Sequence, residues 1–181
     1  DRINHAEHKL VRKNLDKVEL KSKFPAHSFG KQMELAARLI AGGSGVPVIK
    51  CSLGGFDTHA GQLYRHPRLM SKLAEAIFAF TQAMKAAGRW DKILVITYSE
   101  FGRRPRENAS GGTDHGTAAP HFMLGGRVRG GFYGEQPPLD QLRNENFEHR
   151  VDFREMYAAV ARDWWGLKAE FLSTKALSVI V

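Results

Sequence analysis

Three short polar segments of the sequence contain the residue types that bind metal ions or transfer protons. They read Gly-Gly-Phe-Asp-Thr-His at 54–59, Ser-Glu-Phe-Gly-Arg at 99–103 and Gly-Thr-Asp-His-Gly at 112–116. Together they supply two imidazoles and three carboxylates, which form a ligand set suited to zinc, manganese or iron. The candidate metal ligands are therefore Asp57, His59, Glu100, Asp114 and His115.

Each of these segments also has an ordinary structural interpretation. Asp57 is compatible with the N-cap of the helix that follows, Glu100 with a solvated carboxylate, and Asp114 with a turn that its side chain caps. The placement of the segments after predicted strands favours a shared site, because separate structural roles do not explain it. Arg103 belongs to a run of arginines that is either solvated or clamps an anion through its guanidinium groups.

Two apolar runs predict the strands that would position these segments. Residues 46–53 form a short run rich in β-branched residues, and residues 93–98 form a second one. Between them, residues 63–87 have the apolar periodicity of a long helix. Strand, helix and strand in this order make a βαβ unit, whose strands are parallel. We expect Asp57 and His59 at the carboxyl end of the first strand, where α/β sheets expose ligands.

Further elements are predicted on both sides of this unit. Residues 33–40 have helical spacing and stop at a glycine pair, and residues 152–165 form a final helix with Asp152 as its N-cap. Residues 99–120 read as a long, Gly-rich polar loop, and residues 121–124 as one more short strand. This order of elements predicts an α/β sandwich.

Composition limits the classes of protein that remain. The 181 residues allow one compact domain, and 43% hydrophobic with 25% charged residues is typical of a globular protein. No apolar run is long enough to span a membrane. The formal net charge of +8 attracts anions, but the basic residues are scattered, so no specific nucleic acid is expected and a nucleic-acid-binding domain is a weaker alternative.

The order of the motifs resembles the family called domain of unknown function 1501, a bacterial family related to the alkaline phosphatase and sulfatase superfamily. The matching segments are those at 54–59, 99–103 and 112–116, together with Gly-Gly-Arg-Val-Arg-Gly-Gly at 125–131 and Asp-Phe-Arg at 152–154. The resemblance implies a three-layer α/β/α sandwich with a mostly parallel sheet. It also implies a divalent metal, with zinc foremost and manganese or calcium as alternatives, in an exported or periplasmic protein.

Two departures from alkaline phosphatases leave the number of metals open. Asp57 and His59 are similar to a strand-end Asp and His of those enzymes, but one residue separates them where three are usual. Glu100 takes the place of an acidic ligand, and Phe101 falls where those enzymes have a histidine. A second alignment equates Asp114 and His115 with their Asp-His pair.

The family resemblance does not supply a reaction. The first hypothesis from the candidate residues is a metal-dependent hydrolase-like protein that acts on a small anionic ester, a phosphate or a sulfate, with Arg103 neutralising charge on the transferred group. The alternative on the same fold is a non-catalytic protein that binds an anion or a sugar.

The chain is expected to be the C-terminal part of a larger domain, because it supplies few strands for such a sheet. Its expected parts are a basic helical lead at 1–28, a family-matching core at 29–166 and a tail at 167–181. A missing N-terminal half or an oligomer partner would then cover an open sheet edge. Residues 1–181 alone are accordingly expected to lack hydrolase activity.

Overall fold

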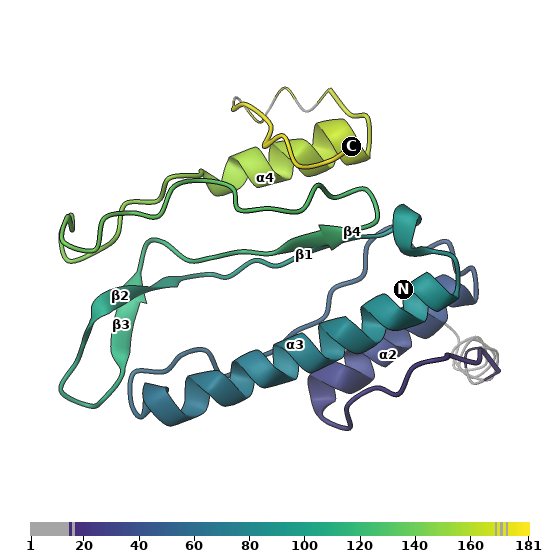
Figure 1. Cartoon of the computed structure of the whole chain (residues 1–181), viewed down its shortest axis with the longest axis horizontal. Coiled ribbons are helices and arrows are strands. Elements are labelled where there is room, and N and C mark those ends of the chain that lie inside the picture. The colour runs from purple at the N-terminus through teal and green to yellow at the C-terminus, as the bar shows by residue number, and fades with distance from the viewer. Residues whose placement is uncertain (1–14, 16, 169, 171, 173) are drawn as a thin grey trace, which may run out of the picture. The chain divides into compact units, whose positions relative to one another are not determined.

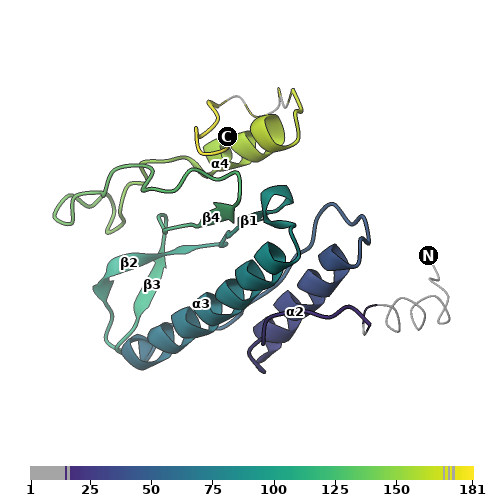
Figure 2. The ribbon, with the colours of Figure 1, turned by 45° about the vertical axis from the view of Figure 1, so that its right-hand side comes forward.

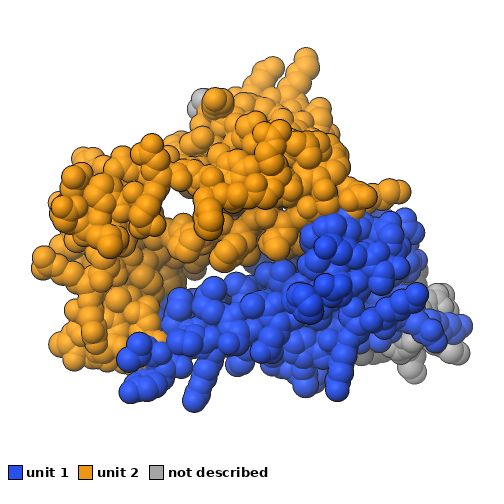
Figure 3. Space-filling model, in the orientation of Figure 1, with its two compact units in different colours: residues 1–58, 63–90 blue, residues 59–62, 91–181 orange. Residues whose placement is uncertain are grey.

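The computed structural model describes residues 15, 17–168, 170, 172 and 174–181. Most of the basic lead expected at 1–28 therefore lies outside the described residues. The chain divides into two compact units, coloured separately in Figure 3. The first contains residues 1–58 and 63–90, and the second contains residues 59–62 and 91–181.

The first unit contains two helices that run side by side, α2 (Ser28–Ala41) and α3 (Gln62–Ala86) (Figures 1 and 2). Both were expected from apolar periodicity. Helix α2 stops at Gly42, which caps it, and the His27 side chain accepts a hydrogen bond from the Gly30 amide at its start. Each helix buries a face rich in alanine, completed by larger side chains: Phe29, Met33, Phe80 and Met84.

The strand expected at 46–53 does not form. A strand needs a neighbour for its backbone groups, and the side-chain amide of Gln32 takes that place at Ser52. Gln32 Nε2 donates to the Ser52 carbonyl at 3.0 Å, and the Ser52 amide donates to Gln32 Oε1 at 2.9 Å. Val46 and Val48 stay 47% and 63% exposed. The expectation that Asp57 and His59 follow a parallel strand is therefore wrong.

The second unit contains two antiparallel sheets of two strands each. Strand β1 (Leu94–Ile96) pairs with β4 (Met123–Gly125), and β2 (Gly102–Glu107) pairs with β3 (Thr113–Gly116). The run at 93–98 was correctly expected to contain a strand. The partner of this strand was not predicted correctly, because β1 pairs with β4, which follows it in the chain, and not with the run at 46–53, which precedes it.

The predicted α/β/α sandwich with a mostly parallel sheet is thus wrong for the described residues, which hold only two-stranded antiparallel sheets. The segment expected to be a polar loop contains the β2–β3 hairpin instead. Among the described residues each strand pairs with a single neighbour, so each sheet has unpaired edges.

The C-terminal helix begins where the sequence predicted. Helix α4 (Phe153–Ala159) continues as a π-helical turn, η2 (Val160–Trp164), and a short 3₁₀ turn, η1 (Trp90–Lys92), precedes β1. Asp152 caps α4 in a reciprocal capping box with Glu155. None of the described helices combines the length and the apolar character that crossing a bilayer requires.

The negative charge of the Asp152 cap leads to one prediction about how the stability of the fold depends on pH. Hydrogen bonds from the Arg154 side chain and amide hold the pKa of Asp152 well below its usual value of 3.8. A depressed native pKa stabilises the fold above the unfolded pKa, and this contribution is lost as the pH falls through the native value. Asp152→Asn keeps the cap, and we expect this variant to unfold at a lower urea concentration than the wild type at pH 7. The difference between the two urea midpoints should become smaller below about pH 4. The same difference in midpoint at pH 7 and at pH 2.5 would contradict this.

Candidate metal-binding site

The β2–β3 hairpin places two of the candidate residues side by side. Its register puts Arg103 opposite His115 and Gly102 opposite Gly116. The two glycines are required by close backbone contacts, because a Cβ at Gly102 would lie 2.0 Å from the Ala118 carbonyl oxygen. A Cβ at Gly116 would lie 2.5 Å from the Arg103 carbonyl carbon. Directly paired residues project to one face of a sheet, so Arg103 and His115 share a face.

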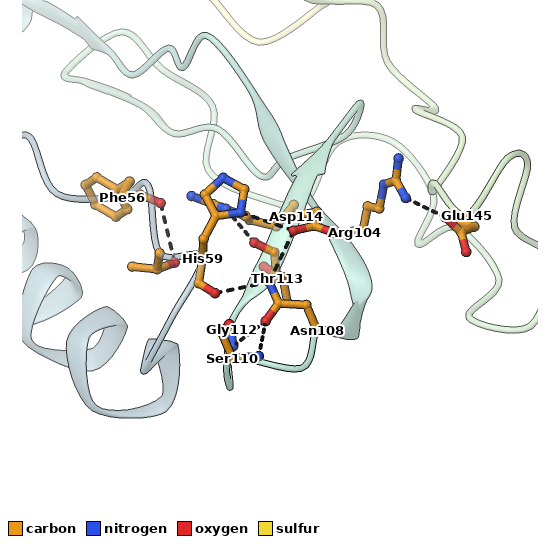
Figure 4. A network of polar contacts seen from close by, with 11 residues as sticks. Phe56, His59, Arg104, Asn108, Ser110, Gly112, Thr113, Asp114 and Glu145 are labelled. Carbon is orange, nitrogen blue, oxygen red and sulfur yellow. Dashed lines mark hydrogen bonds and ion pairs between the residues drawn. The ribbon is translucent and has the colours of Figure 1, made fainter.

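His59 is held against the loop of this hairpin by hydrogen bonds from a short segment, residues 59–62. The Gly61 amide donates to the Ser110 carbonyl at 3.2 Å, and the Gln62 amide donates to the Gly111 carbonyl at 2.9 Å. Asn108 Nδ2 donates to the His59 carbonyl at 3.0 Å (Figure 4). The segment that carries His59 is thereby fixed to the hairpin at both of its ends, by the Asn108 side chain at His59 and by backbone hydrogen bonds at Gly61 and Gln62.

The side chains of His59 and Asp114 interact directly. His59 Nδ1 lies 3.1 Å from Asp114 Oδ1, and the two side chains are 46% and 53% exposed (Figure 4). Hydrogen bonds from Asn108 and then from His59 lower the pKa of the Asp114 carboxyl. At this exposure the pair contributes little to stability, so its main effect is on the orientation of the imidazole.

The rings of Phe101 and His59 both lie close to the ring of His115. The rings of His59 and His115 have centroids 4.8 Å apart, and the Phe101 ring stacks on His115 at 3.8 Å with an interplanar angle of 7°. The Arg103 guanidinium lies 5.0 Å from the centroid of the Phe101 ring, and its Nη1 donates to the Thr113 carbonyl at 2.7 Å. The position of each imidazole is therefore set by contacts on more than one side.

Three of the five candidate ligands have their ligand atoms close together. Asp57, His59 and His115 each supply one such atom, and these atoms lie within 4.8 Å of one another. One residue, Thr58, joins Asp57 to His59 along the chain, and its side chain is fully buried between these two exposed neighbours. Asp114 binds His59 instead of joining this group, and the exposed Glu100 lies outside it.

Sequence reasoning missed two residues that contact the candidates. Phe101 was considered only as a replacement for a histidine, and Asn108 was not considered. The Ser-Glu-Phe-Gly-Arg segment carried a signal for Phe101. In an extended segment, side chains two positions apart lie on the same side, and Phe101 is two positions from the candidate Arg103. Asn108 had no comparable signal, since asparagine is common in loops for purely structural reasons.

A pocket in the second unit was also missed. It has a volume of about 570 Å³ and lies between strand β2 and the segment at 139–147. Its lining residues combine apolar side chains with one charge of each sign: Pro105, Arg106, Leu139, Asp140, Leu142 and Phe147. The lining residues from Leu139 onward are not in any of the motifs that pointed to chemistry.

Comparison with known proteins identifies the family. A family model described as "Protein of unknown function (DUF1501)" matches residues 5–167, which is most of the chain. The chain belongs to this family. No curated protein and no solved structure matches it. The expected resemblance to the DUF1501 family is confirmed, and the match includes all six candidate site residues.

Proposed function

We propose that this DUF1501 protein is a metal-dependent hydrolase-like protein that acts on a phosphate or sulfate ester. The observation that supports this best is the grouping of Asp57, His59 and His115, whose ligand atoms lie within 4.8 Å of one another. Two imidazoles and a carboxylate are the ligand set of many catalytic metal sites, which keep a further position open for water or substrate.

The donor types favour zinc over the other candidate metals. Imidazole nitrogens suit zinc, whereas calcium prefers a shell made entirely of oxygen atoms. Manganese accepts mixed nitrogen and oxygen ligands and is the second choice. The Asp114 carboxylate on His59 supports the proposal further, because metal-binding histidines commonly donate their other ring N–H to a carboxylate.

The chain's own residues give this proposed site the features of an ester-binding surface. A divalent cation held here would supply Lewis acidity to an ester oxygen. Arg103 brings a positive charge to the face that carries His115, and the Thr113 carbonyl and the Phe101 ring hold its guanidinium in place. A charge fixed before the substrate arrives stabilises a developing anion without the cost of reorganisation.

A non-catalytic metal-dependent anion-binding protein is the second candidate function. The exposure of His59 and Asp114, about half of each side chain, favours it. Hydrolytic sites usually exclude water around the reacting group, which strengthens the electrostatic interactions within them. Binding of an anion without turnover does not need this exclusion.

Turnover measurements separate these two functions. The natural full-length protein is incubated with phosphate and sulfate esters in the presence of zinc, manganese or calcium, beside His115→Ala and the control His149→Ala, an exposed histidine outside the group. We expect metal-dependent hydrolysis that His115→Ala abolishes and His149→Ala retains. Metal-dependent binding of an ester without turnover would support the second candidate, and neither binding nor turnover would contradict both.

A further inference from the structure

Asn108 uses both ends of its side-chain amide in the hairpin loop. Its Oδ1 accepts hydrogen bonds from the Ser110 amide at 3.0 Å and from the Gly112 amide at 3.2 Å. Its own backbone amide donates to the Gly112 carbonyl at 2.8 Å. Since only the oxygen can accept from two backbone N–H groups, the orientation of the amide is fixed.

With the oxygen turned into the loop, the amide nitrogen of Asn108 faces the candidate site. Nδ2 has two hydrogens, and two acceptors lie within reach. These are the His59 carbonyl oxygen at 3.0 Å and Asp114 Oδ1 at 3.1 Å (Figure 4). Asn108 therefore connects three parts of the second unit: the loop turn, the backbone of His59 and the side chain of Asp114.

This arrangement determines which nitrogen of His59 carries hydrogen. Asp114 Oδ1 lies next to both Asn108 Nδ2 and His59 Nδ1. An ionised carboxylate can only accept hydrogen bonds, so Nδ1 of the imidazole has to be the donor. In the neutral ring the other nitrogen, Nε2, then keeps its lone pair, which is the form needed by a metal ligand or a base.

We propose that Asn108 is a positioning residue that, through Asp114, fixes His59 in the Nδ1–H tautomer and leaves Nε2 as the electron-pair donor. This inference deepens the proposed function. It rests on that function only in assigning the lone pair of Nε2 to a bound metal. Asn108 acts on the histidine by two routes, since it holds both the backbone of His59 and the carboxylate that orients the ring.

The test reads the tautomer of His59 directly in protein freed of metal by a chelator. Nuclear magnetic resonance of the intact chain with labelled histidine distinguishes the two neutral tautomers, and a His59→Gln variant assigns the signal. We expect the wild type to hold the Nδ1–H tautomer. Asn108→Ala should shift His59 toward the other tautomer, because the Asp114 carboxylate loses the hydrogen bond that holds it beside Nδ1. Asn108→Asp should do the same, because two neighbouring carboxylates repel each other and Asp114 turns away from the ring.

Two variants separate positioning from folding. Ser110→Ala is the matched control, because the contacts of Ser110 in this network come from its backbone alone, and it should leave the tautomer unchanged. Asn108→Asp keeps the oxygen that the loop amides need, so it remains informative if Asn108→Ala does not fold. A folded Asn108→Asp protein with the wild-type tautomer would overturn the proposal.

The same experiment distinguishes this inference from the proposed function. The tautomer is read without metal or substrate, so a protein that binds no metal and still shows an Asn108-dependent Nδ1–H form retains the inference and loses the function. A protein that binds metal through His59 with the wild-type tautomer in Asn108→Asp retains the function and loses the inference.

Discussion

Replacing His115 with alanine should lower the affinity for zinc by roughly 100-fold or more. Loss of a residue that only orients a ligand already costs about 10–100-fold, and His115 is itself one of the three grouped ligands. The substitution also removes the ring on which Phe101 stacks, so the hairpin loses a packing contact. Calorimetric titration of metal-free protein with zinc measures the change in affinity.

The control for this prediction is His149→Ala. His149 is exposed and lies outside the metal-ligand group, so its removal should leave the zinc affinity unchanged. Equal affinities in wild type and His115→Ala would assign His115 a structural role in the ring stack and remove it from the candidate ligands.

Replacing Gly102 with alanine should destabilise the protein by about 3 kcal/mol or more, because the new Cβ would lie 2.0 Å from a backbone oxygen. Backbone atoms cannot move aside as a flexible side chain can, so the β2–β3 hairpin has to shift. For a chain of this length the expected fall in the thermal midpoint is roughly 6–12 °C. Thermal unfolding followed by circular dichroism measures it.

Gly130→Ala is the matched control for Gly102→Ala. A Cβ at Gly130 would meet no described atom within 4 Å, so this substitution should leave the thermal midpoint nearly unchanged. A Gly102→Ala protein as stable as Gly130→Ala would show that the close approach of Gly102 and Ala118 is absent in solution.

The helices could be predicted from the sequence because their signals are local. Apolar spacing and glycine stops indicated α2 and α3, and Asp152 as the N-cap indicated the start of α4. The strand partners could not be predicted in the same way. An apolar run such as 93–98 indicates a buried strand, but which strand it pairs with depends on contacts between distant segments. The parallel sheet was inferred from element order alone, and β1 and β4 pair as antiparallel neighbours instead.

The candidate site was predicted in part. The sequence singled out His59 and His115, and the structure brings their rings to 4.8 Å, although no parallel strand positions them. It also named Asp114, whose carboxylate lies against His59 Nδ1 and not in the group of three. Residue types suggest which side chains can bind a metal, but which of them lie together depends on the fold. Asn108 illustrates this limit, because one of its four side-chain hydrogen bonds reaches His59, which is distant in the chain.

The central claim is that Asp57, His59 and His115 hold a divalent metal, and elemental analysis tests it most directly. The chain is purified without chelator, incubated with zinc, freed of unbound metal and measured beside a His59→Ala variant. We expect one zinc ion per wild-type chain, since the three residues form one group, and a loss of that ion in the variant. A wild-type chain without zinc, or the same zinc content in His59→Ala, would contradict the claim.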